Sequence, residues 1–224
     1  MSSTPPPVAG VTAIVPVRSL GAGKTRLADE LSVEQRAGLA GAMLADVCAA
    51  LRASRVERIV VAASGPAGAS AASALGLDVV LDPPGTTSLD EAVASAASRA
   101  GRTDALLVVM ADLPRLSPTD VDRVVGTDGQ VVVAPTADGG TGALLRRPAT
   151  IVGTAYGPGS AGRHVRLARA AGAAVTTVDT PGFRDDVDTL EDLRALLGGP
   201  IGRATAAFLR QHRLVPDGGW SPGA

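Results

Sequence analysis

The stretch VTAIVPVRSLGAGKTRL, residues 11–27, decides the fold. Its first seven residues are almost wholly apolar, and the next ten contain two glycines, two arginines and the only lysine of the chain. A continuous apolar run of this length is typical of a strand buried on both faces of a sheet. A basic, glycine-containing turn after such a strand suits phosphate groups. The stretch therefore predicts a strand, a basic glycine-containing loop of the kind that suits phosphates, and a short helix in an α/β protein.

Similar apolar runs recur along the chain and alternate with helical periodicity. The predicted strands are Val11–Val17, Arg58–Ala63, Asp78–Leu81, Ala105–Met110, Gln130–Ala134, Gly142–Arg146 and Ala174–Val178. Helix starts are marked by the capping patterns Ser32 with Gln35, Ser88 with Glu91, Ser117 before Pro118 and Thr189 with Asp192. A last helix is predicted over Pro200–Arg213. This alternation predicts a three-layer α/β/α Rossmann-like fold with a mostly parallel sheet.

One pair of runs interrupts the alternation. Two strand-like runs within Gln130–Pro148 are joined by Ala137-Asp138-Gly139-Gly140, which indicates a hairpin and makes the sheet mixed. Because we find no internal repeat or linker, we expect a single domain over residues 11–214. Residues 1–10 and 215–224 are rich in Pro, Gly and Ser, and we expect them to be flexible ends.

Composition excludes several classes of protein. A net charge of −1 and an aromatic content of 2% argue against a nucleic-acid binder. The single cysteine, Cys48, excludes an internal disulfide and indicates a reducing compartment. No apolar run approaches the ~20 residues of a membrane span, and the first ten residues do not resemble a secretory signal. We therefore expect a cytoplasmic protein that binds neither nucleic acid nor membranes.

The loop after the first strand offers the first candidate site, because ligands of open α/β sheets bind at the carboxyl ends of strands. Gly23-Lys24-Thr25 supplies the end of a P-loop motif, but Arg18 stands where that motif needs its first glycine. An ordinary basic turn and a triphosphate loop both stay open. A single lysine among 20 arginines favours the triphosphate loop, because an ammonium is a compact point charge and a guanidinium is a planar fork.

Two acidic positions offer a metal site. Asp112 follows the most apolar predicted strand, where it is either a turn or cap residue or a metal ligand. Asp185, Asp186 and Asp188 repel one another unless a cation or a helix N-terminus compensates. Because Asp188 or Thr189 can cap the following helix, Asp186 is the better ligand candidate. Asp112 and Asp186 on neighbouring strand ends are the expected Mg²⁺ ligands.

A glycine turn, Gly157-Pro158-Gly159-Ser160, precedes a helical stretch through Arg166–Ala171. Ser160 is the predicted cap of that helix, and the N–H groups after it would attract an anion. Thr141 could offer its hydroxyl to the same anion. The alternative is a plain capped turn with His164 on the surface.

The motifs occur in an order that identifies a family. They are AIVPVRSLGAGKTRL (13–27), SLDEAV (88–93), ADLP (111–114), GGTGAL (139–144), YGPGSAGRH (156–164) and DVDTLEDL (186–193). Together they resemble the guanylyltransferases of coenzyme F-420 biosynthesis, within the superfamily of nucleotidyltransferases with a nucleotide-diphospho-sugar transferase fold. The resemblance implies an enzyme that joins the GMP of GTP to the phosphate of a small three-carbon acid and releases diphosphate.

The resemblance also implies roles for particular residues. The nucleotide would contact Arg18, Lys24, Arg26 and Gly85, the last beside Pro84 and the turn 88–91 where the family places base and ribose. The catalytic residues would be Lys24, Asp112 and Asp186, the two carboxylates holding Mg²⁺. The phosphorylated acid would contact Thr141, Gly157 and Ser160. One departure is Gly142, where some relatives have Asn.

The acceptor is the least determined part of the reaction. The family uses phosphoenolpyruvate, 2-phospho-L-lactate or, in some members, phosphoglycerate. The Arg- and Ala-rich composition suits a high-GC actinobacterium, in which the family is expected to use phosphoenolpyruvate and make enolpyruvoyl-2-diphospho-5'-guanosine. Two other classes stay open: a P-loop-like NTPase or kinase, and a non-catalytic nucleotide-binding module. The oligomeric state, a homodimer included, is also left open.

Overall fold

The structure, a computed structural model, describes residues 10–18, 20, 25–196 and 199–214. The ends that we expect to be flexible fall almost wholly on 1–9 and 215–224 and so lie outside the described residues. Lys24 also lies outside them. Of the helices that are described, none has both the length and the apolar character needed to cross a bilayer.

Seven strands form one sheet in the described part of the chain, in the order β3-β2-β1-β4-β6-β5-β7. They are β1 (Val11–Val17), β2 (Arg58–Ala63), β3 (Asp78–Leu81), β4 (Ala105–Val109), β5 (Val131–Pro135), β6 (Thr141–Arg146) and β7 (Val175–Thr177). β6 runs antiparallel to both neighbours, and the other pairs are parallel. The predicted strands, the hairpin and the mostly parallel mixed sheet are thus confirmed.

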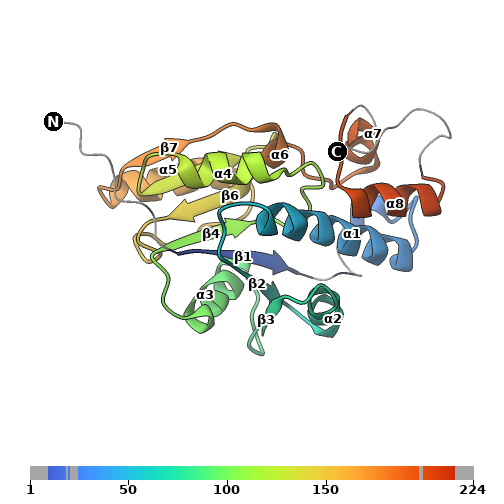
Figure 1. Cartoon of the computed structure of the whole chain (residues 1–224), viewed down its shortest axis with the longest axis horizontal. Coiled ribbons are helices and arrows are strands. Elements are labelled where there is room, and N and C mark those ends of the chain that lie inside the picture. The colour runs from blue at the N-terminus through green and yellow to red at the C-terminus, as the bar shows by residue number, and fades with distance from the viewer. Residues whose placement is uncertain (1–9, 19, 21–24, 197–198, 215–224) are drawn as a thin grey trace.

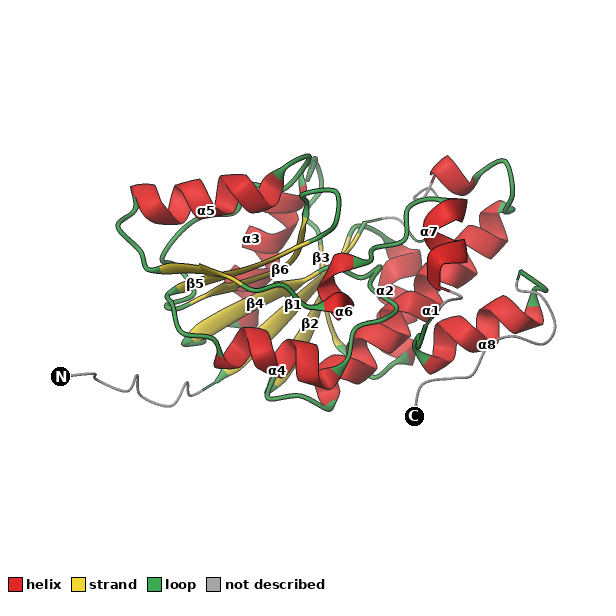
Figure 2. Cartoon of the chain, turned by 90° about the horizontal axis from the view of Figure 1, so that it is seen from above, coloured by secondary structure: helices red, strands yellow, loops and turns green. Residues whose placement is uncertain are grey.

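Helices cover both faces of this sheet (Figures 1 and 2). They are α1 (Val33–Arg52), α2 (Pro66–Ala74), α3 (Leu89–Ala100), α4 (Pro118–Gly126), α5 (Ser160–Ala170), α6 (Pro181–Arg184), α7 (Leu190–Ala195) and α8 (Arg203–Gln211), with a short 3-10 helix at Thr25–Leu27. The four predicted capping patterns all occur at helix starts, including Pro118 at the first position of α4. Sequence patterns do not predict α2 and α6, because α2 is built of small residues and α6 is one turn long.

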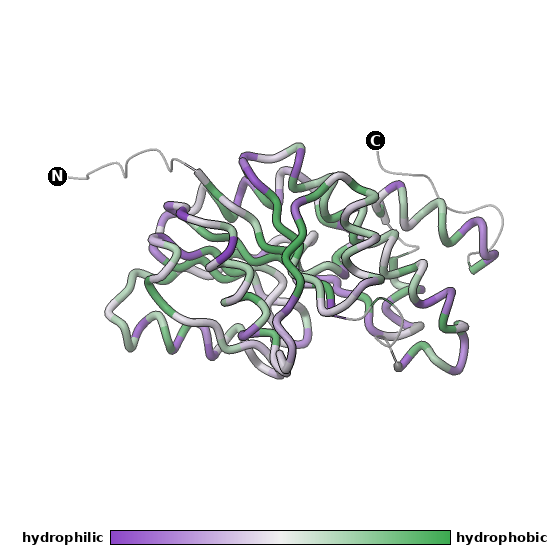
Figure 3. Tube along the Cα trace, turned by 90° about the horizontal axis from the view of Figure 1, so that it is seen from below, coloured by the Kyte–Doolittle hydropathy of each residue, from purple (hydrophilic) through white to green (hydrophobic). Residues whose placement is uncertain are grey.

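Alternate strand residues face opposite layers. In β1, Val11, Ala13, Val15 and Val17 join the cluster under α1, α2, α4 and α6, whereas Ile14 packs with Ala96 of α3 on the other face. β5 and β6 contribute Val131, Val133 and Leu144 to a cluster with α5 on that second face. The hydropathy of the chain follows this arrangement, with the strands at its apolar centre (Figure 3). The three-layer α/β/α fold is therefore confirmed.

A second core lies beyond the carboxyl edge of the sheet, where α7 and α8 stand beside the first half of α1 (Figure 1). Asp46 of α1 is 8% exposed and accepts the backbone N–H groups of Ala204 and Thr205 at 2.9 and 2.8 Å. This carboxylate caps α8 from another helix. It explains why α8 begins at Arg203, three residues after the predicted start at Pro200.

Candidate active site

A cavity of about 220 Å³ opens where β1 and β4 end. Arg18 lies on it after β1, Asp112 lies on it after β4, and α1 adds Arg36 and Met43. The chain leaves β1 toward β2 on one side and returns to β4 on the other. In open α/β sheets, ligands bind at such a switch point, in the crevice outside the carboxyl ends of the strands.

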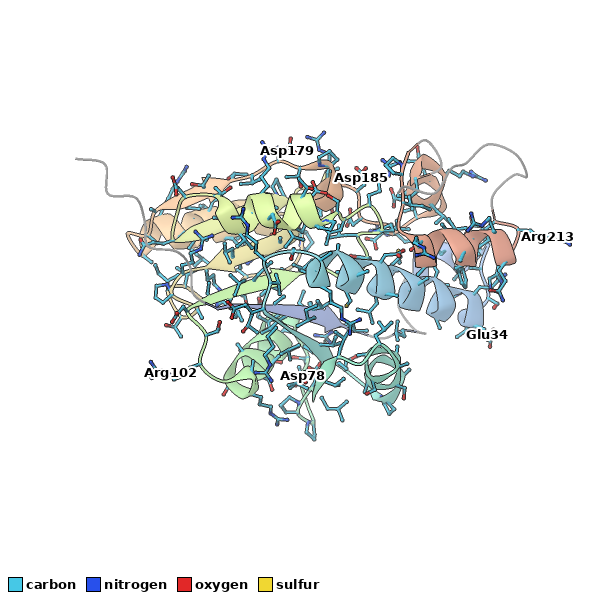
Figure 4. All side chains as sticks on the ribbon, viewed as in Figure 1. Glu34, Asp78, Arg102, Asp179, Asp185 and Arg213 are labelled. Carbon is cyan, nitrogen blue, oxygen red and sulfur yellow. The ribbon has the colours of Figure 1, made fainter. Side chains whose placement is uncertain are left out.

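A second cavity of about 270 Å³ adjoins the first, since Asp188 lines both. Its walls carry Arg26, Asp138 and Asp186. At this cavity the guanidinium of Arg115 donates to the carboxylate of Asp185 at 2.9 Å. Asp185 is the residue that follows α6 (Figure 4). The cavity is therefore rich in both charges, as a site for phosphates and a cation would be.

Asp112 and Asp186 lie close together. The N–H of Val187 donates to the backbone carbonyl of Asp112 at 3.2 Å, which joins the two acidic segments. Burial and the neighbouring carboxylates of Asp112, Asp138 and Asp188 raise the pKa of Asp186 to about 7. Carboxylates so crowded favour a cation, because a positive charge offsets both the burial and the repulsion.

The donor set fits a hard divalent cation. Among the described residues, no three His, Cys, Asp or Glu side chains converge as a metal cage. One or two carboxylates that share the ion with substrate phosphates are the usual protein contribution to a Mg²⁺ site. The carboxylates of Asp112 and Asp186 have the oxygen atoms that a site of this kind would use.

The predicted nucleotide residues are spread along the same edge of the sheet. Arg18 donates to the carbonyl of Thr87 at 3.1 Å, which ties the end of β1 to the loop before α3. Gly85 lies in that loop with a φ of +87°, a conformation that favours glycine. Arg26 is exposed, lines the second cavity and helps lower the pKa of Asp138.

Thr141, Gly157 and Ser160 converge at the start of β6. Because β6 is antiparallel to β4, its first residues lie at the edge where β4 ends. The hydroxyls of Thr141 and Ser160 are 2.8 Å apart, and the N–H of Ser160 donates to the carbonyl of Gly157 at 3.0 Å. Tyr156 N–H donates to Asp90 at 3.0 Å, so this turn is also linked to the first turn of α3.

His164 extends the hydroxyl pair into a chain of hydrogen bonds. The N–H of Ala155 donates to Nε2 at 2.9 Å, and Nδ1 lies 3.1 Å from Oγ1 of Thr141. A neutral ring that accepts at Nε2 carries its proton on Nδ1 and donates it to Thr141. Burial lowers the pKa of His164 to about 4, so the ring is neutral at pH 7. The Thr141 hydroxyl can then donate to Ser160.

Two interpretations of this turn are wrong, namely Ser160 as the cap of the helix and the alternative that places His164 on the surface. Gly159, in the left-handed conformation with a φ of +66°, is the cap of α5, and Ser160 is the first helical residue. The first N–H groups of α5 are taken, that of Ser160 by Gly157 and that of Ala161 by the carbonyl of Gly139 at 3.3 Å. His164 is not a surface residue, since it is 1% exposed.

Sequence reasoning gave no site role to several residues at these cavities. The sequence pattern predicts only that Asp138 is part of a turn and that Asp188 is a candidate helix cap. Thr189 is the cap of α7, and Asp188 lies on both cavities. Arg36 and Met43 line the first cavity from α1. The helical spacing in this segment indicates packing, and no motif there indicates ligand binding. The acidic run 185–188 was the one signal that could have pointed to Asp188.

Comparison with known proteins identifies the family. The profile of the family described as Guanylyl transferase CofC like matches residues 11–217. The chain belongs to this family. Two relatives, both called phosphoenolpyruvate guanylyltransferase, come from Nocardia farcinica and Roseiflexus castenholzii. They are 38% and 36% identical to this guanylyl transferase, over 94% and 92% of its length and 93% and 96% of their own.

Solved structures share the fold. A Desulfovibrio desulfuricans G20 protein, described as a nucleotide-diphospho-sugar transferase, has a TM-score of 0.72 at 20% identity, over 91% of this chain and 95% of its own. A CMP:2-keto-3-deoxy-manno-octonic acid synthetase in complex with CTP has a TM-score of 0.58 at 14% identity, over 85% and 99%. A Mycobacterium tuberculosis H37Rv protein in complex with manganese has a TM-score of 0.53 at 21% identity, over 86% and 100%.

Proposed function

We propose that this guanylyl transferase joins the GMP of GTP to the phosphate of phosphoenolpyruvate. The products are diphosphate and enolpyruvoyl-2-diphospho-5'-guanosine, an intermediate of coenzyme F-420 biosynthesis. The name shared by relatives that match over most of their length supports this acceptor. The observation that carries the reaction type is the pair Asp112 and Asp186 between two adjoining cavities.

The chemistry needs positioning and charge compensation more than proton transfer. An oxygen of the acceptor phosphate attacks the α-phosphorus of GTP, the bond to the bridging oxygen breaks, and diphosphate leaves. The nucleophile is already an anion, so no general base is required. The main obstacle is the repulsion between two polyanions, which Arg18, Arg26 and Lys24 would reduce at the triphosphate.

A divalent cation, for which we propose Mg²⁺, would be held by Asp112 and Asp186 and would stabilise negative charge on the phosphoryl group. The segments that carry these two carboxylates are joined by a backbone hydrogen bond, from the N–H of Val187 to the carbonyl of Asp112. Burial and the neighbouring carboxylates raise the pKa of Asp186 to about 7, and a nearby positive charge would favour its ionised form. The two residues would thus hold the ion next to both cavities, since Asp112 lines the first cavity and Asp186 the second.

The proposed acceptor group is Thr141, Gly157 and Ser160. Thr141 and Ser160 are buried, at 5% and 1% exposure, and His164 fixes the direction of the hydrogen bond between their hydroxyls. With Thr141 donating to Ser160, the Ser160 proton is left to donate to an oxygen of the acid. This assignment rests on the family resemblance together with the convergence of the three residues.

Diphosphate release tests the proposal. GTP, ATP and CTP are each combined with phosphoenolpyruvate, 2-phospho-L-lactate and 3-phosphoglycerate, and we expect release that requires GTP and phosphoenolpyruvate together. Orthophosphate or a phosphorylated acceptor would instead indicate an NTPase or kinase, and nucleotide binding without turnover a binding module.

A matched pair of variants tests the metal ligand. Asp112→Asn should lower kcat/KM by roughly 100-fold or more, because a lost metal ligand costs several kcal/mol of transition-state stabilisation. Asp104→Asn is the control, since the exposed Asp104 precedes the same strand at the opposite edge of the sheet. Near-normal release by Asp112→Asn would remove this residue from the mechanism.

A further inference from the structure

Asp82 has an unusual environment. It follows β3 directly, and its N–H donates to the carbonyl of Ala63 at 2.9 Å, so its backbone extends the pairing of β3 with β2. Within the part of the chain that the structure describes, both of its carboxylate oxygens are buried and have no hydrogen-bond partner. It is the one carboxylate among the described residues in this condition.

An unpartnered buried carboxylate is unfavourable in the free protein. Burial raises the pKa of Asp82, and the positive charge of Arg18 offsets only part of that effect. No hydrogen bond joins Arg18 to Asp82, and the guanidinium donates to the Thr87 carbonyl. A carboxylate has two acceptor oxygens and no donor. A ligand that presents two adjacent N–H donors would satisfy both oxygens at once.

The position of Asp82 suits the base of a nucleotide. β3 and β1 are two strands apart on one edge of the sheet, a separation of about 10 Å. Arg18 at the end of β1 lines the cavity that also contains Asp112, and it is close enough to Asp82 for their charges to interact. A nucleotide with phosphates near Asp112 can therefore extend past Arg18 toward the end of β3.

Guanine is the base with matching donors. Its N1–H and N2 amino group are adjacent on one edge of the ring and both donate. Adenine has an acceptor at N1, and cytosine has an acceptor at N3, so each would place a lone pair against the carboxylate. We propose that Asp82 selects GTP by accepting the N1–H and the N2 amino group of guanine with its two oxygens. This inference rests on the proposed function and adds the residue that selects the base.

GTP analogues with altered bases distinguish base recognition by Asp82 from a purely structural role of this residue. ITP lacks the N2 amino group, and XTP has a carbonyl oxygen in its place. Wild-type enzyme should prefer GTP over ITP by roughly tenfold, the usual effect of one charge-assisted hydrogen bond. Asp82→Asn supplies one acceptor and one donor, which match N1–H and the carbonyl of xanthine. Its kcat/KM should fall roughly 100-fold for GTP and be higher for XTP than for GTP.

Asp78→Asn is the matched control, because Asp78 is at the opposite end of the same strand, where it pairs with Arg58 at 2.7 Å (Figure 4). It should keep the wild-type order of GTP, ITP and XTP. An Asp82→Asn enzyme that still prefers GTP, or that loses all three nucleotides equally, would overturn the inference. Equal use of GTP and ITP by wild type would overturn it without any variant.

The same comparison made by calorimetric nucleotide binding separates this inference from the proposed function. If wild type releases no diphosphate from GTP and phosphoenolpyruvate, the proposed reaction fails, and the binding order of GTP, ITP and XTP still decides the role of Asp82. If diphosphate is released normally and Asp82→Asn keeps the wild-type order, the reaction stands and the inference is wrong.

Discussion

His164 should make the stability of this protein depend on pH, by an amount that follows from its environment. Burial lowers the pKa of its imidazole from 6.5 to about 4. Between these values the unfolded chain binds a proton that the native chain does not, so stability rises with pH by about 1.4 kcal/mol per unit. The contribution of the neutral His164 ring to the free energy of unfolding is complete above about pH 6.5 and is lost as the pH falls toward 4. It amounts to about 2 kcal/mol between pH 7 and pH 5.

The assay compares urea unfolding of wild type and His164→Asn at pH 5, 6 and 7. At pH 7 the variant should be the less stable protein, because it loses the bond from Nδ1 to Thr141 or the bond from Ala155. On going to pH 5, the stability of wild type relative to the variant should fall by about 2 kcal/mol. His212→Asn is the control, since it removes the other histidine of the chain at the end of α8.

A difference between wild type and variant that stays constant from pH 7 to pH 5 would refute this reasoning. An NMR titration of the wild-type imidazole gives a second measurement that does not need the variant to fold. A midpoint near 6.5 for His164 would mean that burial and its two hydrogen bonds do not hold the ring neutral.

Four further substitutions test other parts of the structure. Ser160→Ala should raise KM for phosphoenolpyruvate roughly tenfold and leave KM for GTP nearly unchanged; steady-state kinetics with the reverse pattern would mean that the two sites are exchanged. Lys24→Arg should lower kcat/KM for GTP roughly tenfold because the head groups differ in shape, and an unchanged value would contradict the role expected from the sequence. Asp46→Ala should lower the free energy of unfolding by about 2–3 kcal/mol, more than Asp46→Asn, since it leaves two N–H groups of α8 without an acceptor. Gly142→Ala should cost about 1–3 kcal/mol, because a Cβ there would lie 2.5 Å from the carbonyl oxygen of Phe183; a denaturation curve that matches wild type would show that α6 moves freely.

The strands were predictable because the sheet is buried on both faces. Each strand then needs a continuous apolar run, and all seven runs in the sequence coincide with strands to within one or two residues. Helices that begin with a capping box were equally predictable, because the cap residue and its partner three positions later can be recognised in the sequence. α2 was not, because its packing uses Ala72 and Gly68 against the sheet, and small residues leave no recognisable period.

Candidate site residues could be named from the sequence only where they lie within a few residues of the end of a predicted strand or in a recognisable turn. Arg18 directly follows β1, and Asp112 comes three residues after the end of β4. Asp138 and Asp188 approach Asp186 through the β5–β6 turn and the segment after α6, contacts that no local pattern encodes. The predicted cap at Ser160 is wrong by one position because Gly159, in the left-handed conformation, precedes the first helical residue, and the Ser160 hydroxyl lies against Thr141 instead of capping α5.

The cap that Asp46 provides to α8 has a consequence for synthesis of the chain. The acceptor carboxylate and the N–H of Thr205 are 159 residues apart. At 5–20 residues per second, a ribosome needs roughly 10–30 s to add that length. During most of this time α1 has neither α8 nor Val187 to cover Leu39 and Met43, which share one cluster with them. The segment that carries Asp186 is therefore fixed against α1 only after Val187 and α8 have been synthesised, so we expect the carboxylates of Asp112 and Asp186 to take up their final arrangement only from that point on.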